Sequence, residues 1–305
     1  MRLDGRRESS NVEDRRGSSS GGGSPFGGMI PLGGGGGRMG CGTIIIVLAF
    51  LFLMTGGDLG KVLQIIGGGG TTSEYVESSS DGSYVGSEEE EELARFTRQI
   101  LASTEDVWGR KFEEMERTYE PPTLVMYTGS IQTGCGAGSA AMGPFYCSAD
   151  QKVYIDLSFF RDMKKTLGAD GDFAYAYVIA HEVGHHVQYL LGDLSRAHKQ
   201  MAQLNSTDAN RISVQIELQA DFYAGVWGHY ENKLFKSMEK GDLEEALVTA
   251  QKIGDDYLQK KAQGYTNSKT YTHGTSEQRE RWFKKGWTTG DLSKGNTFAI
   301  NYNNL

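Results

Sequence analysis

Residues 172–192 constrain the fold of this chain more than any other stretch, because they combine an apolar run with the pattern His-Glu-x-x-His. The run predicts one helix, in which His181 and His185 stand four residues apart and share a face. Two imidazoles at this spacing can hold one zinc ion. Glu182 then lies beside the metal, where it can take a proton from an activated water.

A chance match on a polar, solvated helix face is the alternative interpretation of this motif. Its surroundings argue against that alternative, because Val178, Ile179 and Ala180 directly precede it. Imidazole and carboxylate groups are costly to bury among such residues without a partner. A bound metal would be such a partner, so the context favours a zinc site.

A second stretch, residues 217–227, supplies the groups that this site still lacks. Apolar residues at helical spacing predict another helix here, with Glu217 and Asp221 on one face. Glu217 can be the third protein ligand, leaving the fourth zinc position open, and Asp221 can fix the tautomer of a ligand histidine. The alternative is a solvated acidic face, but the alanines and the glycine beside the pair indicate closely packed helices.

The same residues carry a family resemblance. The pattern His-Glu-x-Gly-His-His-Val-Gln, followed by Glu-Leu-Gln-Ala-Asp, resembles the "putative neutral zinc metallopeptidase" family of bacteria, and more distantly the gluzincins. Further similar segments extend the resemblance to nearly the whole chain apart from its glycine-rich parts: residues 11–16, 143–147, 153–160 and 273–279. The resemblance implies a membrane-anchored zinc peptidase. Its fold would be α+β and mainly helical, with a small mixed or antiparallel sheet, as in zincins.

The resemblance also implies a strand that binds the substrate. In zinc peptidases of this kind an edge strand lies over the metal and pairs with the extended peptide by main-chain hydrogen bonds. The predicted strand proposed for this role consists of Val153, Tyr154, Ile155 and Asp156. The alternative is an ordinary half-buried strand.

A loop histidine near the C-terminus is a candidate for transition-state stabilisation. Zinc peptidases commonly bring a further side chain to the oxyanion that develops on the attacked carbonyl. His273 lies in a glycine-containing loop before a predicted helix and could serve in this way, with Arg279 holding the loop or the substrate. The alternative is a loop histidine with structural hydrogen bonds only. His186, beside the ligand His185, is predicted to be structural.

The first 86 residues differ from the rest in composition and hold much of the glycine. Residues 1–39 are rich in Gly, Ser and Arg and predict a disordered cytoplasmic tail. Residues 40–57 contain the one strongly hydrophobic run and predict a transmembrane anchor, in preference to a cleaved signal peptide or a buried element. Residues 58–86 predict a flexible linker, and residues 87–305 the zinc metallopeptidase domain. Arginines before the run place the N-terminus inside the cell and this domain outside the inner membrane, in the periplasm.

Three cysteines remain to be assigned. Cys135 and Cys147 bracket a loop rich in Gly and Ala, and outside the cytoplasm such a pair is expected to form a disulfide. The alternatives are two buried free thiols or zinc ligation by them. Cys41 precedes the apolar run, which is the wrong order for a lipoprotein site.

The predicted reaction is hydrolysis of a peptide bond in a peptide or protein substrate, with Zn²⁺ as cofactor and Glu182 as general base. The formal net charge of -8 gives no reason to expect nucleic acid as a partner. One alternative is a zinc amidase or deformylase, in which a cysteine would be the third ligand. The other is a membrane-tethered binding protein that keeps the metal for stability alone. The substrate, the cleavage preference and the oligomeric state are not specified by the sequence.

Overall fold

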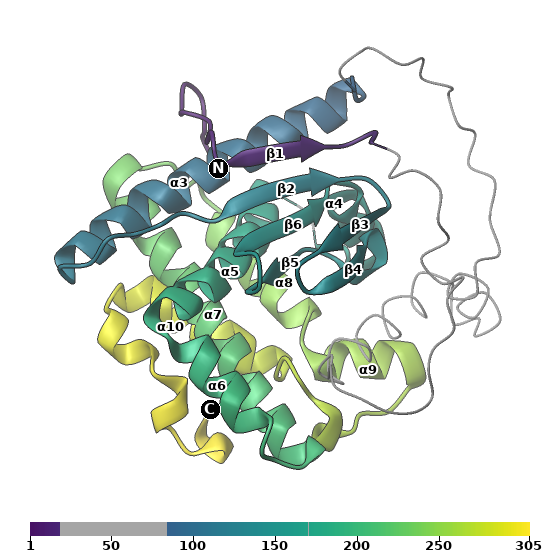
Figure 1. Cartoon of the computed structure of the whole chain (residues 1–305), viewed down its shortest axis with the longest axis vertical. Helices are drawn as coiled ribbons and strands as arrows, with labels where there is room; N and C mark the ends of the chain where they lie inside the picture. The colour runs from purple at the N-terminus through teal and green to yellow at the C-terminus, as the bar shows by residue number, and fades with distance from the viewer. Residues whose placement is uncertain (19–83, 170) are drawn as a thin grey trace.

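The computed structural model describes residues 1–18, 84–169 and 171–305, which form a mainly helical α+β fold with a small sheet (Figure 1). The sheet has four strands in the order β1-β2-β6-β5, with β5 antiparallel to β6 and the other neighbours parallel. A separate two-stranded hairpin, β3–β4, follows β2. The strands are β1 (Val12–Arg15), β2 (Thr123–Tyr127), β3 (Ser130–Thr133), β4 (Gly136–Ser139), β5 (Phe145–Cys147) and β6 (Lys152–Asp156). The predicted α+β class, mainly helical with a small mixed sheet, is confirmed.

The helices surround one main hydrophobic core. In Figure 1, α3 runs alongside β1, while α6, α7 and α10 lie on the other side of the strands. The core is filled by Trp108 of α3, Leu124 of β2, Val183 of α5 and Trp227 of α7. The helices are α3 (Glu88–Glu114), α4 (Ser158–Asp162), α5 (Asp172–Leu191), α6 (Asp193–Met201), α7 (Ser206–Phe235), α8 (Asp242–Lys252), α9 (Asp255–Gln263) and α10 (Ser276–Thr289). Short turns complete the fold: a π turn at Met163–Leu167 and 3-10 turns at Ala140–Met142, Ser268–Thr270, Leu292–Gly295, Thr297–Ala299 and Tyr302–Asn304.

Glycines set how closely the three helices of the body approach one another. A Cβ atom added at Gly286 of α10 would lie 2.0 Å from the carbonyl oxygen of Phe222 on α7, and one at Gly225 of α7 would lie 2.1 Å from that of Phe283. At Gly184 of α5 it would lie 3.0 Å from the carbonyl oxygen of Ala220. Backbone cannot yield as a flexible side chain does, so these contacts require glycine and bring α5, α7 and α10 together.

The N-terminal segment corrects one prediction. Residues 1–18 were expected to be part of a disordered tail, but β1 pairs with β2 over four residues, and its flanks contact α3 and α7. The error has a physical cause: the charges that suggested solvation have partners that lie far away in the sequence. The remaining part of the predicted tail, the transmembrane anchor at 40–57 and the linker up to residue 83 lie outside the described residues. Among the described helices, none is both long and apolar enough to cross a membrane.

The position of β6 corrects a second prediction. The segment Val153, Tyr154, Ile155 and Asp156 was expected to be the edge strand that pairs with substrate, yet β6 has β2 on one side and β5 on the other. Its backbone groups are therefore used within the sheet. The strand at the margin is β5, which follows β4 in the chain and folds back antiparallel onto β6.

Candidate metal centre

Three side chains from two helices converge on one point. His181 and His185 project from α5 and Glu217 from α7, with one ligand atom of each within 4.8 Å of the others. Glu217 Oε2 lies 3.2 Å from His181 Nε2, and Glu217 Oε1 lies 3.5 Å from His185 Nε2. Ligand bonds of about 2.0–2.1 Å at tetrahedral angles separate neighbouring donor atoms by about 3.3 Å. Both the donor types and their spacing therefore fit a zinc ion.

The two helices hold these side chains in place through close packing. The i, i+4 spacing puts both imidazoles on the face of α5 that meets α7. The two rings meet edge to face, with their centroids 4.8 Å apart. Gly184 stands between the histidines, where any side chain would press on the backbone of α7 at Ala220. The glycine of the motif thus lets Glu217 reach the histidines.

Asp221 orients the first histidine. Its Oδ1 atom accepts hydrogen bonds from His181 Nδ1 at 2.8 Å and from the Tyr177 hydroxyl at 2.6 Å. Because a carboxylate only accepts, the His181 proton is on Nδ1 and Nε2 faces Glu217. The structure thus brings Asp221 to the place that the sequence analysis expected. Tyr177 was not predicted, although it lies one turn before His181 on the same helix.

Arg279 lies behind Asp221. Its Nε donates to Asp221 Oδ2 at 2.8 Å and its Nη2 to Oδ1 at 2.9 Å. The side chain is 3% exposed, so the guanidinium holds Asp221 and is shielded from any substrate. Of the two roles suggested for Arg279, these contacts give no support to a contact with substrate. Its further bond to the Ile253 carbonyl, at 3.4 Å, links α10 to the end of α8.

Gln188 orients the second histidine in a corresponding way. Its side-chain oxygen lies 2.9 Å from His185 Nδ1, which leaves Nε2 toward Glu217. Its side-chain nitrogen donates to the Ile216 carbonyl at 2.7 Å and to Gln219 Oε1 at 3.0 Å. Sequence reasoning missed this role, although the spacing of three residues from His185 on one helix was a usable signal.

Without metal, the three candidate ligands differ in how readily each takes up a proton. Burial disfavours a charged ring at His181, but the Asp221 and Glu217 carboxylates together outweigh it and raise the pKa of His181 to about 10. At His185 burial prevails and lowers the pKa to about 4. Burial would raise the pKa of Glu217, yet the nearby His273 and His185 rings hold it well below its usual range. Without metal, His181 is therefore the one of the two candidate ligand imidazoles that carries a positive charge beside Glu217.

Glu182 is placed to exchange protons. Its side chain is buried, which raises the pKa of its carboxyl to about 7 against the opposing effect of the His181 charge. The backbone of Tyr146 in β5 lies near this carboxylate and partly offsets the rise in its pKa. A carboxyl that titrates near neutrality can both accept and return a proton at working pH.

His273 lies in the loop before α10, close enough to Glu217 for the two charges to interact. Burial opposes its charged form, but the Glu217 and Asp255 carboxylates raise its pKa. Its Nδ1 lies 2.9 Å from Thr272 Oγ1 and 3.5 Å from Asp255 Oδ1. The predicted residue is thus near the ligands, although its contribution to catalysis stays a prediction.

Asp255 is a residue that sequence reasoning missed. Its Oδ2 accepts the backbone N–H groups of Thr272 and His273 at 2.7 Å and of Gly274 at 3.0 Å. The carboxylate therefore fixes the loop as well as pairing with the ring of His273. It lies 18 positions upstream and at the start of another helix, so no local pattern could have indicated the contact.

His186 is a structural residue, in line with the sequence analysis. Its Nδ1 lies 3.0 Å from the Tyr146 hydroxyl and its Nε2 lies 2.7 Å from the Glu120 carbonyl oxygen. Burial lowers its pKa to about 4, so the ring is neutral at ordinary pH. The contact joins α5 to β5 beside the metal ligands.

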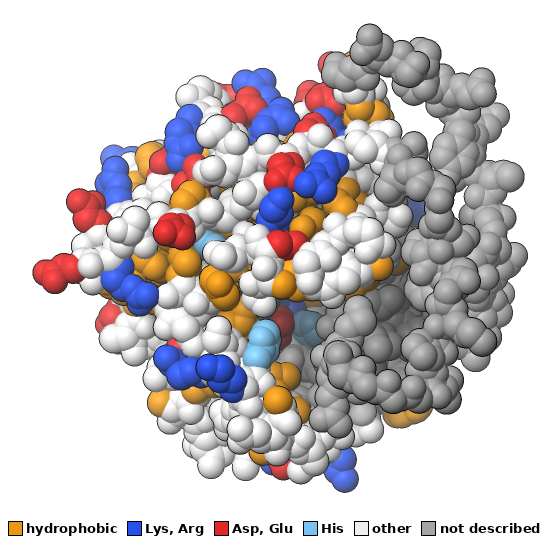
Figure 2. All heavy atoms as spheres, in the orientation of Figure 1, with side chains coloured by type: hydrophobic (Ala, Val, Ile, Leu, Met, Phe, Trp, Pro, Cys, Tyr) orange, Lys and Arg blue, Asp and Glu red, His pale blue; other side chains and the backbone are white. Residues whose placement is uncertain are grey.

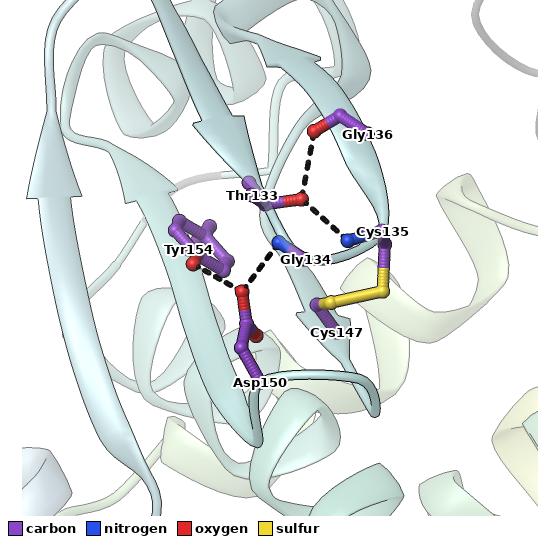
Figure 3. Close-up of a disulfide and its surroundings, with 7 residues drawn as sticks. All are labelled: Thr133, Gly134, Cys135, Gly136, Cys147, Asp150 and Tyr154. Atoms are coloured by element: carbon purple, nitrogen blue, oxygen red, sulfur yellow. Dashed lines mark hydrogen bonds between the residues drawn. A yellow bond between two sulfur atoms is a disulfide. The ribbon is translucent and has the colours of Figure 1, made fainter.

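The margin of the sheet is fixed to the hairpin by a disulfide. Cys135, in the turn between β3 and β4, is bonded to Cys147 of β5, as Figure 3 shows. Asp150 accepts hydrogen bonds from the backbone N–H of Gly134 and from the Tyr154 hydroxyl, both at 2.7 Å, beside the same turn (Figure 3). The disulfide expected from the sequence is therefore present.

The ligand side chains reach solvent. His185 is 12% and Glu217 15% exposed at the side chain, whereas Asp221 is fully covered. In the space-filling view, histidine and acidic side chains meet at the surface near the middle of the face shown (Figure 2). The site is thus partly open on one side and packed on the other, as a catalytic metal centre requires.

Comparisons with known proteins agree with this geometry. A family described as "putative neutral zinc metallopeptidase" matches residues 1–298. The uncharacterised protein YpfJ of Escherichia coli strain K12 is 51% identical over 306 residues, which cover 98% of this chain and 99% of YpfJ. The uncharacterised protein Mb2605 of Mycobacterium bovis is 40% identical over 191 residues, or 59% of this chain and 64% of Mb2605. No solved structure matches.

Proposed function

Because the chain belongs to the putative neutral zinc metallopeptidase family, we propose that it is a zinc-dependent endopeptidase. The proposed zinc ligands are His181, His185 and Glu217. The observation that carries the proposal is the convergence of these three side chains, together with the buried Glu182, which directly follows His181 in the sequence. Three protein ligands leave a coordination position for water or substrate, which distinguishes hydrolytic from structural zinc sites.

The proposed reaction divides the work among a few residues. Bound zinc would polarise the scissile carbonyl and make a water molecule acidic. Glu182 takes a proton from the attacking water and returns it to the leaving amine, for which a pKa of about 7 is well suited. Asp221 and Gln188 keep the two imidazoles turned so that each presents Nε2 to the metal.

His273 is proposed to stabilise the developing oxyanion. Although burial opposes it, the Glu217 and Asp255 carboxylates raise the pKa of His273 and so favour the protonated ring, and its contacts with Thr272 and Asp255 are made through Nδ1. The Nε2–H is then available to the oxygen of the attacked carbonyl. The alternative, a purely structural histidine, makes the same Nδ1 contacts, so only function distinguishes the two.

The open side of β5 is the proposed binding strand for substrate. Within the described sheet β5 pairs with β6 alone, and the backbone of Tyr146 on β5 lies near the Glu182 carboxylate. The open side thus borders the proposed general base. An extended peptide added there would be held by main-chain hydrogen bonds, which accept many sequences.

The two alternative functions differ from an endopeptidase in testable ways. A deformylase-like site needs a cysteine thiolate on the metal, but Cys135 and Cys147 are bonded to each other and Glu217 fills the third position. A catalytically silent binding protein needs no general base, yet Glu182 is buried with a pKa poised for proton transfer. Both observations favour the peptidase.

The domain is also proposed to work outside the cytoplasm. The disulfide between Cys135 and Cys147 supports this, because such bonds persist in oxidising compartments and are uncommon in the cytosol.

Glu182→Gln tests the proposed mechanism. We expect the full-length variant to bind zinc as the wild type does and to lose about 10²–10⁴-fold in peptide turnover, because the amide cannot accept the proton. Metal analysis and cleavage of an unfolded generic protein measure the two properties. Glu277→Gln, at an exposed position of α10, is the matched control. A Glu182→Gln enzyme of normal activity would rule out the mechanism, and wild-type protein that binds but never cleaves would favour the binding protein.

His273→Ala separates the two interpretations of that residue. If it stabilises the oxyanion, turnover should fall by about 10²–10³-fold with zinc content unchanged. Activity and zinc content that both stay at wild-type levels would assign His273 a structural role.

A further inference from the structure

The first 18 residues, here called the N-terminal arm, are built into the sheet. Strand β1 pairs in parallel with β2, with Val12 opposite Leu124 and Arg15 opposite Tyr127. The backbone N–H of Leu124 also donates to the Asn11 carbonyl at 2.9 Å. The side chains of β2 are almost fully buried, so without the arm this core strand would become an edge strand with unpaired backbone groups.

A partly buried ion pair fastens the arm to the helix that carries Glu217. Glu231 of α7 is 0% exposed, and its carboxylate accepts a 2.7 Å hydrogen bond from Arg6 Nη1. Ser237 donates to it at 2.9 Å and Ser103 donates as well. The Arg6 guanidinium also lies over the ring of Phe235, 3.7 Å from its centroid. Arg6 is thus the cation that neutralises a carboxylate with no access to water.

Further ion pairs join the arm to two other elements, α3 and β6. Arg7 pairs with Asp106 of α3 at 2.7 Å, and Glu8 pairs with Arg98 of the same helix at 2.6 Å. Other contacts reach the start of α3 and strand β6: Arg16 with Glu91 at 3.0 Å and Glu13 with Lys152 at 2.5 Å. Exposed pairs of this kind contribute little singly. Their number and the burial of Arg16 show instead that the arm and its binding surface are complementary along its length.

We propose that the N-terminal arm is a permanent part of the peptidase domain, so that Ser18 and Tyr84 face the same compartment. Paired strands lie about 4.8 Å apart, whereas the hydrocarbon core of a bilayer is about 30 Å thick. A chain that crossed a membrane once between residues 18 and 84 would put β1 and β2 on opposite sides. The topology expected from the sequence, a cytoplasmic N-terminus with the domain outside, is incompatible with this pairing. The inference stands whether or not the protein cleaves peptides.

Cysteine labelling in cells tests which side each end faces. In a full-length Cys41→Ser background, Ser18→Cys and Val85→Cys are made singly, both at exposed positions, with Asn303→Cys as a marker for the domain. A membrane-impermeant maleimide is applied to intact and to permeabilised cells. All three positions should label under the same condition. Labelling of Ser18→Cys from the side opposite to Val85→Cys and Asn303→Cys would overturn the proposal.

A second experiment tests whether the arm is docked. Arg6→Ala in purified full-length protein should lower Tm by on the order of 10 °C, because Glu231 is left buried without a cation. Adding Glu231→Gln should then restore part of the loss. Arg2→Ala, at an exposed position of the same arm, should change little. If Arg6→Ala fails to accumulate, recovery of folded protein in the double variant supports docking. An Arg6→Ala protein as stable as the wild type would refute it.

Discussion

Replacing Gly286 with alanine should damage the metal centre from a distance. Gly286 lies two turns along α10 from Arg279, and its backbone touches that of α7 directly. An added Cβ atom would lie 2.0 Å from the Phe222 carbonyl oxygen, whereas ordinary contact begins at 3.4 Å. The two helices must therefore separate locally by about 1.4 Å, the difference between these distances. Because the neighbour is backbone, no side-chain rotation can relieve the contact.

The change in stability caused by Gly286→Ala is the sum of two opposing contributions. Overpacking of this kind costs about 1–3 kcal/mol, while alanine in place of a helical glycine returns up to about 1 kcal/mol. The shift also reaches the hydrogen bonds from Arg279 to Asp221, which are 2.8 and 2.9 Å long and would be broken by a further 1.4 Å. Loss of such support behind a ligand histidine weakens metal affinity by about 10–100-fold.

Thermal unfolding of metal-free protein and competition with a chelating dye measure the two effects of Gly286→Ala. Gly109→Ala in α3 is the matched control, because a Cβ atom there meets nothing within 4 Å. The control should gain about 0.5–1 kcal/mol and keep its zinc affinity. A Gly286→Ala protein that gains stability like the control, with unchanged zinc affinity, would refute the inferred coupling between helix packing and the site.

Two further predictions follow from the charges and the disulfide. The pKa of His181, raised by Asp221 and Glu217 from 6.5 to about 10 despite burial, means that folded metal-free protein binds this proton more tightly than unfolded protein does. The stabilising contribution of this proton is full below pH 6.5 and is lost as pH rises toward 10. The Tm of chelator-treated protein should therefore fall across that window, while zinc affinity should rise about tenfold per pH unit. A Tm independent of pH between these values would contradict the assignment. Replacing Cys135 and Cys147 together with serine should lower stability by about 2–3 kcal/mol, since the bond closes a 12-residue separation. Zinc affinity should not change in that variant, and its loss would revive a cysteine-ligated site.

The metal ligands were predictable from the sequence because their geometry is local. His181 and His185 depend only on the 3.6-residue repeat of one helix, and Glu217 and Asp221 on that of another. The alanines and the glycine beside Asp221 then indicated that the two helices approach closely. Helix periodicity together with these small residues was enough to predict that the four side chains lie near each other.

The remainder of the site depends on contacts between distant segments, which no local pattern encodes. Asp255 pairs with a loop 18 residues later, and Arg279, which sequence alone cannot tell from a substrate-binding arginine, is buried behind Asp221. The arginines of the N-terminal arm resembled a solvated charge run because their acidic partners lie on α3 and α7. The order of strands in the sheet is also not their order in the chain, so the sequence does not show that β6 lies inside the sheet and β5 at its margin.

The most direct test of the whole account is a crystal structure of the zinc-loaded, full-length protein with data collected at the zinc absorption edge. The account predicts one strong anomalous peak about 2.0–2.2 Å from His181 Nε2, His185 Nε2 and a carboxylate oxygen of Glu217. A peak on other side chains, or protein that takes up no zinc at this point while remaining folded, would contradict it.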